Sequence, residues 1–305
     1  MQDTIQSLIS QQQLPSGFEQ LVESYYAPLA AQMARVLETR RNRGEQQTWL
    51  VGVQGTQGSG KSTCSLFLKH LLEKEFQLSV VVLSIDDFYL TRAERLTLSQ
   101  EIHPLLKTRG VPGTHDVELI QTTLHQLSEL PEHAFMLVPR FDKATDDRKP
   151  KAKWDEVEGK IDVILFEGWC VGLDPQMDAA LSLPINELEA TEDADGAWRQ
   201  FVNQKLKQEY AALYAQLDDL IILQAPSFKV VHEWRLLQEQ KLKEKMARKG
   251  VHNLQLMSPD EIHRFISHYQ RLTEHGLITL PHKARWVLEL DDQHAIVQFT
   301  INGEH

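Results

Sequence analysis

Gly55-Thr-Gln-Gly-Ser-Gly-Lys-Ser62 is a glycine-rich segment with the spacing G-x-x-x-x-G-K-S. It follows the apolar run 49–53 and precedes a helical pattern over 64–76. Glycines at these positions let backbone N–H groups curl around phosphate oxygens, and the following helix directs the positive end of its dipole at the same anion. The segment therefore predicts a loop that binds the phosphates of ATP or GTP.

Two side chains of this loop have their own predicted roles. We expect Lys61 to reach the β- and γ-phosphates and the Ser62 hydroxyl to ligate Mg²⁺. The residues expected to bind the nucleotide are Gly55, Thr56, Gln57, Gly58, Ser59, Gly60, Lys61, Ser62 and Thr63. A glycine-rich turn before an ordinary helix is the alternative, which the strand on one side and the helix on the other disfavour.

Short apolar runs alternate with helical patterns along the chain. The predicted strands are 49–53, 79–85, 134–138, 161–166 and 220–223. This alternation is typical of an α/β fold with a mostly parallel sheet flanked by helices. The pattern over 18–41 predicts a helix packed on that core, and the runs 284–290 and 295–301 predict a C-terminal hairpin.

Net charge, cysteine count and hydrophobic runs limit which partners and which cellular location are expected. A formal charge of −11 over 305 residues argues against a nucleic acid or an anionic membrane surface as the main partner. Two cysteines, Cys64 and Cys170, are too few for a disulfide framework and predict buried thiols in a reducing compartment. No apolar run is long enough for a membrane span and the first residues do not read as a leader, so we expect a cytoplasmic enzyme.

The acidic, proline-containing segment 183–196 predicts an exposed loop rather than a core element. The chain contains no internal repeat. We therefore expect residues 1–305 to form a single domain, with an N-terminal helical segment over 1–45 packed on its core. The sequence gives no indication of the oligomeric state.

The second predicted strand ends in Ser84-Ile-Asp-Asp-Phe-Tyr89. Ligands of doubly wound sheets bind at the carboxyl ends of the strands, so Asp86 and Asp87 are expected to face the γ-phosphate. One of the two could orient an acceptor hydroxyl and take its proton as a general base. The alternative is that the pair only caps the next helix.

Further polar residues follow other predicted strands and loops. Glu167 ends the run 161–166 and is expected to hold Mg²⁺ directly or through water, unless it is a solvated strand-end side chain. Arg109 and His115 lie in a Pro/Gly-rich loop and could bind a small carboxylate. Three more candidates for this acceptor site are Asp116, Arg140 and Lys143, although Asp116 could simply cap a helix over 117–127.

Several motifs, in chain order, carry a family resemblance. They are the phosphate loop, Asp86-Asp-Phe-Tyr89, Arg109-Gly-Val-Pro-Gly-Thr-His-Asp116, Pro139-Arg-Phe-Asp-Lys143 and Phe166-Glu-Gly-Trp169. Together they resemble the plant-type D-glycerate 3-kinases, which group with uridine kinase, phosphoribulokinase and bacterial pantothenate kinases. The resemblance covers nearly the whole chain, from about residue 18 to the terminal hairpin. It implies a P-loop kinase that uses ATP and Mg²⁺ and phosphorylates a small hydroxylated acceptor, with D-glycerate as the leading acceptor.

The resemblance also assigns residues. It implies that Asp86 is the catalytic base and that Asp87 and Tyr89 belong to the acceptor site. It further implies that a helical lid over about 225–275 closes on ATP, with Arg235 compensating the charge of the transferring phosphoryl group. For the other basic residues of 229–249 a solvated helix face is the better interpretation. Segment 144–150 lacks the glycines usual in this family.

Two rival functions remain at this stage. One is a nucleoside or pantothenate kinase of the same class, and the discriminating feature is whether the pocket presents basic donors to a carboxylate or aromatic faces to a base. A P-loop ATPase or switch protein would consume nucleotide without any acceptor. The chain has no Asn-Lys-x-Asp run, which disfavours a GTPase.

Overall fold

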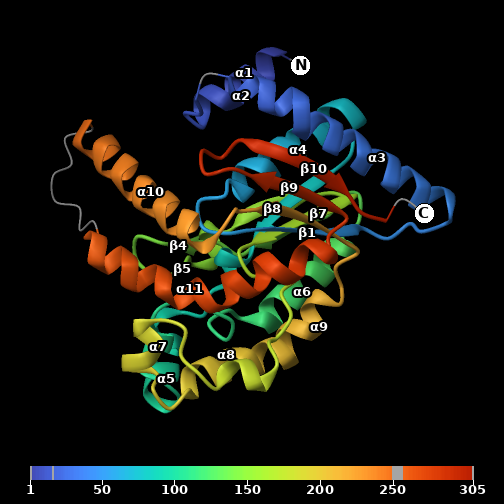
Figure 1. Cartoon of the computed structure of the whole chain (residues 1–305). Coiled ribbons are helices and arrows are strands. Elements are labelled where there is room, and N and C mark those ends of the chain that lie inside the picture. The colour runs from blue at the N-terminus through green and yellow to red at the C-terminus, as the bar shows by residue number, and fades with distance from the viewer. Residues whose placement is uncertain (1, 16, 249–256, 304–305) are drawn as a thin grey trace.

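The computed structural model describes residues 2–15, 17–248 and 257–303 (Figure 1). Within these residues, a central six-stranded sheet has the strand order β10-β9-β8-β1-β7-β2. Its strands are β1 (Trp49–Gly55), β2 (Val80–Ser84), β7 (Val163–Gly168), β8 (Asp219–Gln224), β9 (Trp286–Leu290) and β10 (Ile296–Ile301). Neighbouring strands pair in parallel except for the antiparallel β9 and β10. The predicted mostly parallel sheet and the C-terminal hairpin are confirmed.

Helices cover both faces of this sheet (Figure 1). The described helices are α1 (Gln2–Gln11), α2 (Phe18–Leu21), α3 (Ala27–Asn42), α4 (Lys61–Phe76), α5 (Arg92–Glu101), α6 (Val117–Ser128), α7 (Glu187–Glu192), α8 (Ala197–Lys205), α9 (Ala211–Tyr214), α10 (Phe228–Arg248) and α11 (Pro259–Thr279). In Figure 1, α3 and α4 lie on one side of the sheet, and α6, α9 and α11 lie on the other. No described helix is both long enough and apolar enough to cross a lipid bilayer.

Short helical turns connect or interrupt these elements. The π-helical turns are η1 (Val22–Tyr26) and η6 (Leu206–Tyr210), and the 3₁₀ turns are η2 (Ile85–Phe88), η3 (Pro104–Lys107), η4 (Lys151–Lys153), η5 (Asp178–Leu181) and η7 (Leu280–His282). The helix predicted over 18–41 is thus confirmed as α2, η1 and α3 in series. Tyr26 of η1 packs near Cys64 of α4, and both cysteines are free and buried, as predicted.

Burial explains why β1 occupies the middle of the sheet. All seven residues of β1 are buried, including the fully buried Trp49, which packs edge-on against Trp286 of β9 with ring centroids 6.0 Å apart. A strand covered by helices on both faces needs apolar side chains on both sides, as its sequence provides. The carboxyl end of β1 therefore opens at one edge of a rigid core.

The run 134–138 forms β3 (Phe135–Val138), but this strand lies outside the central sheet, so its predicted place there was wrong. β3 pairs antiparallel with β6 (Asp155–Glu158), and β4 (Phe141–Asp142) pairs with β5 (Asp147–Arg148). The reason is visible in burial: Phe135 is 64% exposed, whereas a central parallel strand is covered on both faces. An apolar run alone does not distinguish these two environments.

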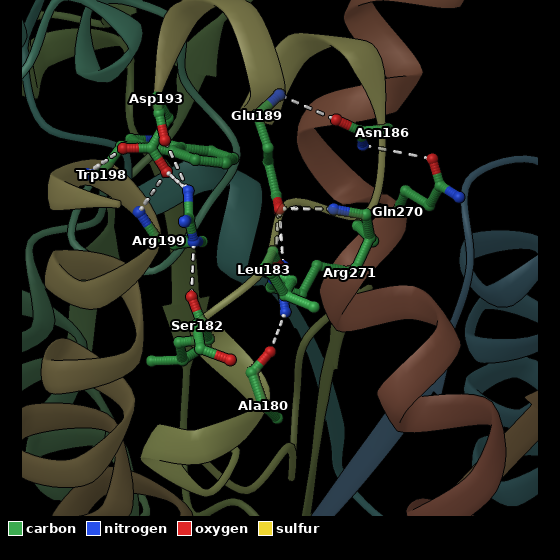
Figure 2. A network of polar contacts seen from close by, with 12 residues as sticks. Ala180, Ser182, Leu183, Asn186, Glu189, Asp193, Trp198, Arg199, Gln270 and Arg271 are labelled. Carbon is green, nitrogen blue, oxygen red and sulfur yellow. Dashed lines mark hydrogen bonds and ion pairs between the residues drawn. The ribbon is translucent and has the colours of Figure 1, made fainter. Parts of the chain in front are cut away.

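The acidic segment 183–196 is largely exposed, as its composition predicts, but it is not a loop throughout. It contains α7, which Asn186 caps, and it buries the carboxylates of Glu189 and Asp193. Arg271 of α11 pairs with Glu189 at 2.6 Å, and Arg199 of α8 pairs with Asp193 at 2.8 Å (Figure 2). Buried carboxylates require such countercharges, and Arg271 is 82 residues away from Glu189 in the chain. Local composition therefore predicts the exposure of most of the segment, but not its helix or its two buried carboxylates.

We predict that Arg271→Met lowers the free energy of unfolding by about 3–5 kcal/mol, because it leaves the Glu189 carboxylate buried without a countercharge. Urea unfolding measures this loss. Arg264→Met is the matched control, since Arg264 of the same helix pairs with Glu192 of α7 at the surface, with side chains 51% and 41% exposed. It should cost at most about 1 kcal/mol. Equal losses in the two variants would contradict the importance of the buried pair.

Candidate active site

The phosphate loop joins β1 to α4 and has the backbone that its glycines permit. Gly58 and Gly60 have φ angles of +83° and +89°, in the left-handed region that favours glycine, and Gly60 directly precedes α4. Three polar side-chain atoms of the loop are buried without a hydrogen-bond partner: Thr56 Oγ1, Gln57 Oε1 and Ser59 Oγ. Buried polar atoms without partners are rare in proteins, so they mark a place where a polar ligand fits.

A contact that the sequence analysis missed closes one side of this loop. A Cβ at Gly58 would lie 2.9 Å from Cβ of Trp234, so the start of α10 packs directly on the loop. The Trp234 ring stacks on His294 with centroids 4.2 Å apart, and His294 Nε2 lies 3.0 Å from the Gly58 carbonyl oxygen. His294 belongs to the turn between β9 and β10, and nothing in its local sequence points to the phosphate loop.

Ser62 and Glu167 meet beside the loop, as predicted. β7 runs next to both β1 and β2, with Glu167 opposite Val53 and Ser84, and Glu167 is 5% exposed. The Ser62 hydroxyl donates to Glu167 Oε1 at 3.0 Å, whereas Glu167 Oε2 is buried without a partner. These hard oxygen donors fit a Mg²⁺ ion that takes its other ligands from nucleotide phosphates and water. Among the described residues, no three His, Cys, Asp or Glu side chains form a metal-binding group by themselves.

Asp86 lies in η2, just after β2, and is held by two neighbours. The Tyr89 hydroxyl donates to its Oδ1 at 2.9 Å, and Lys143 Nζ donates to its Oδ2 at 2.7 Å. Burial alone would raise the pKa of Asp86, but the charges of Lys143 and Lys61 and these two hydrogen bonds bring that pKa down to about 2. Asp86 is thus an ionised carboxylate whose charge interacts with the phosphate-loop lysine.

Asp87 points to different partners. It accepts hydrogen bonds from the guanidinium of Arg140 at 2.8 Å and from the backbone N–H of Phe141 at 3.1 Å. Arg140 also pairs with Asp155 of β6 at 2.8 Å. Burial raises the pKa of Asp87, and the hydrogen bond from Phe141 and the charge of Arg140 oppose that rise. Asp87 therefore anchors the segment that carries Lys143 toward Asp86.

Arg109 forms an ion pair with Asp146, and its guanidinium lies 5.6 Å from the centre of the Phe141 ring. Asp146 has a φ of +55°, a conformation that Asp tolerates better than most residues, which explains how segment 144–150 turns without glycine. The same Asp146 pairs at 3.0 Å with Arg95, which is 1% exposed and also donates to three backbone carbonyls. Two arginines thus share one carboxylate beside the predicted acceptor site.

His115 and Asp116 lie where their loop returns to Tyr89. The His115 ring stacks on the Tyr89 ring with centroids 4.5 Å apart, and burial lowers the pKa of His115 to about 4. Asp116 caps α6 through the backbone N–H of Leu119 at 3.0 Å and pairs with Arg148 at 2.9 Å. The capping interpretation of Asp116 is confirmed, and its place in the acceptor site stays a prediction.

The segment predicted as a lid forms α10 and α11, and its residues 249–256 lie outside the described residues. Arg235 of α10 pairs with Glu239 at 2.7 Å, and its guanidinium lies 5.7 Å from the centre of the Phe265 ring on α11. The structure therefore brings Trp234 to the phosphate loop and directs Arg235 toward α11. Arg235 thus contacts Glu239 and Phe265 rather than the cluster of Lys61, Asp86 and Lys143.

Comparison with known proteins adds three similarities, and no protein-family model matches the chain. The chain is 32% identical over 251 residues to the uncharacterized kinase mug58 of Schizosaccharomyces pombe. This match covers 80% of this chain and 86% of mug58. It is 32% identical over 227 residues to the chloroplastic D-glycerate 3-kinase of Arabidopsis thaliana, covering 72% of this chain and 46% of the plant protein. The chain thus spans about half the length of that plant relative.

A solved structure is similar to the chain over a larger share of its length. The D-glycerate 3-kinase of Cryptococcus neoformans var. grubii superposes with a TM-score of 0.71 at 27% identity. The match covers 90% of this chain and 99% of the fungal one. The similarity therefore extends over nearly the whole of both chains.

We predict that Lys143→Met raises the pKa of Asp86 by roughly 1–3 units, because burial then outweighs the remaining attraction to Lys61. In the wild type, Asp86 should titrate near pH 2, below the ordinary 3.8. The ion pair then stabilises the fold fully above about pH 4 and is lost as the pH falls through 2. Carboxyl ¹³C NMR of Asp86 measures both midpoints. Lys151→Met, at an exposed position of η4, is the control, and equal midpoints in the two variants would contradict the assignment.

Proposed function

The chain belongs to the family of ATP-dependent P-loop kinases that includes mug58 and D-glycerate 3-kinase, and from this premise we propose that it phosphorylates a hydroxyl group of D-glycerate. Phosphorylation of a small hydroxylated molecule follows from the family, and D-glycerate is the acceptor that we propose. Two relatives with the name D-glycerate 3-kinase support the choice of acceptor.

The observation that carries the proposal is the position of Asp86. Its carboxylate is ionised, lies at the carboxyl end of β2 and interacts with the charge of Lys61 in the phosphate loop. In-line transfer requires the acceptor hydroxyl to approach the γ-phosphate from the side opposite to the leaving group. Asp86 would orient that hydroxyl and accept its proton, while Lys61 would stabilise the charge on the phosphate oxygens.

We assign Ser62 and Glu167 to the magnesium site. Their hydrogen bond of 3.0 Å and the unpartnered Glu167 Oε2 support this assignment. Mg²⁺ bound there would neutralise charge on the β- and γ-phosphate oxygens of ATP. Glu167 is held by the register of β7 between β1 and β2, so it needs no rearrangement to take this role.

Arg109 and Lys143 are the proposed binding groups for the acceptor carboxylate. Lys143 is paired with Asp86, and Arg109 is paired with Asp146. Arg109 also lies over the ring of Phe141, which belongs to the same segment as Lys143. Because Asp146 is shared with Arg95, the cluster Arg95–Asp146–Arg109 retains a net positive charge. That charge favours a small anionic acceptor over a neutral nucleoside.

The lid, the domain organisation and the location are also proposals. Closure of the lid over ATP would have to release Arg235 from Glu239 before it could reach the phosphoryl group. A single kinase domain is supported by the central sheet, whose strands come from residues 49 to 301. Two free, buried cysteines are consistent with the proposed cytoplasmic location.

A coupled assay of ADP release tests the proposed function. We expect D-glycerate to stimulate ATP consumption, whereas uridine and pantothenate should not, and Lys61→Ala should abolish the activity without lowering thermal stability. Phosphoglycerate identified as the product would complete the test. Stimulation by uridine or pantothenate alone would reject glycerate, and turnover independent of every acceptor would indicate an ATPase.

We predict that Asp86→Asn lowers kcat by roughly 10²- to 10⁴-fold with little change in ATP affinity, because the amide keeps its size but cannot accept a proton. Asp87→Asn should have a milder effect on kcat, since Asp87 contacts Arg140 and Phe141 instead. Steady-state kinetics and equilibrium ATP binding decide between them. The reverse order of kcat losses would make Asp87 the base.

A further inference from the structure

Tyr210 makes a buried contact with His115 that neither the motifs nor the proposed mechanism accounts for. It ends the π-helical turn η6 and its side chain has no solvent exposure. Its hydroxyl oxygen lies 2.6 Å from His115 Nδ1 and accepts a hydrogen bond from the backbone N–H of Gly113 at 3.1 Å. π-Helical turns in α-helices are uncommon and occur often at functional sites. The position of Tyr210 therefore calls for a functional explanation.

Counting donors and acceptors fixes the direction of this hydrogen bond. A tyrosine hydroxyl has one proton and two lone pairs. The backbone N–H of Gly113 donates to one lone pair of the Tyr210 oxygen, and the other contact of the hydroxyl within hydrogen-bond distance is His115 Nδ1, which is thus the acceptor at hand for its proton. The hydroxyl proton is then free to be donated to His115 Nδ1, which must be unprotonated to accept it. Burial keeps the imidazole neutral by lowering its pKa to about 4, so the single ring proton lies on Nε2.

The Nε2–H group is then a donor without an acceptor. His115 Nε2 is shielded from solvent and has no hydrogen-bond partner. The rest of the loop is satisfied: the Thr114 hydroxyl donates to the Val111 carbonyl at 2.7 Å, and the Trp169 indole donates to the Gly110 carbonyl at 2.9 Å. Among residues 109–116, all of which are described, His115 Nε2 is the one buried side-chain atom left unpartnered. Such an atom is expected where a ligand supplies the missing oxygen.

His115 is also linked to the proposed base, Asp86, through the side chain of Tyr89. Its imidazole stacks on Tyr89, whose hydroxyl holds Asp86 at 2.9 Å, and the charge of Asp86 acts on His115. We propose that Tyr210 is a positioning residue that fixes His115 in the Nε2–H tautomer, so that the ring offers a neutral hydrogen-bond donor to an oxygen of the acceptor substrate. This inference rests on the proposed function for the identity of the ligand, while the tautomer follows from the contacts alone.

NMR tests the tautomer without any substrate. Long-range ¹H–¹⁵N correlation spectra of ¹⁵N-histidine-labelled enzyme at pH 7 distinguish the two neutral tautomers, and His115→Gln identifies the His115 signals by their loss. We expect the Nε2–H pattern in the wild type and a shift toward the Nδ1–H form in Tyr210→Phe, which removes the donated proton. An Nδ1–H or a protonated ring in the wild type would overturn the inference.

Kinetics tests the consequence for the acceptor. Tyr210→Phe should raise the KM for D-glycerate by roughly tenfold, a size typical of a mispositioned binding group, and leave the ATP KM within about twofold. Tyr214→Phe is the matched control, because it removes a hydroxyl one turn further along that contacts Cys170 Sγ at 3.6 Å and not His115. It should leave both constants unchanged.

The two proposals fail in different ways. Identical kinetics for Tyr210→Phe and Tyr214→Phe would overturn the role of Tyr210 in acceptor binding. Absence of glycerate-dependent turnover in the wild type would instead overturn the proposed function, and the NMR spectra would still decide whether Tyr210 sets the tautomer.

Discussion

The complete burial of β1 between β7 and β8 is the constraint on which the site depends. A buried central strand fixes where its carboxyl end lies, and the phosphate loop begins there. The parallel register of β7 places Glu167 at the same edge, next to Ser62 of α4. Apolar packing in the sheet thus positions polar groups whose own interactions are too weak to define the geometry.

Charge compensation is the second principle of the site. The protein carries a net charge of −11, yet cations and carboxylates alternate around Asp86. Lys143 faces Asp86, Arg140 joins Asp87 to Asp155, and Arg95 and Arg109 share Asp146. Each cation is therefore already paired with a carboxylate of the protein, and an anionic ligand that binds the cation takes the place of that carboxylate. This arrangement keeps each long side chain in place before a ligand arrives.

The sequence was sufficient for features encoded locally and insufficient for those encoded by distant partners. The glycine spacing of the phosphate loop and the apolar β1 identify the fold, because each feature depends on neighbouring residues. The expectation of an exposed loop over 183–196 missed the buried carboxylate of Glu189, because the Arg271 that neutralises it lies far away in the chain. The contact of Gly58 with Trp234 and the partnership of Tyr210 with His115 escaped notice for the same reason.

The turn between β9 and β10 has a consequence for how the protein is made. His294 of this turn contacts the Gly58 carbonyl and stacks on Trp234, so the hairpin of β9 and β10 completes the surroundings of the phosphate loop. During synthesis, the phosphate loop leaves the ribosome long before this hairpin does. In a nascent chain, β1 can be buried only once β7 and β8 have been made, and the phosphate loop gains its contact with His294 only after a further stretch of chain, 236 residues beyond Gly58.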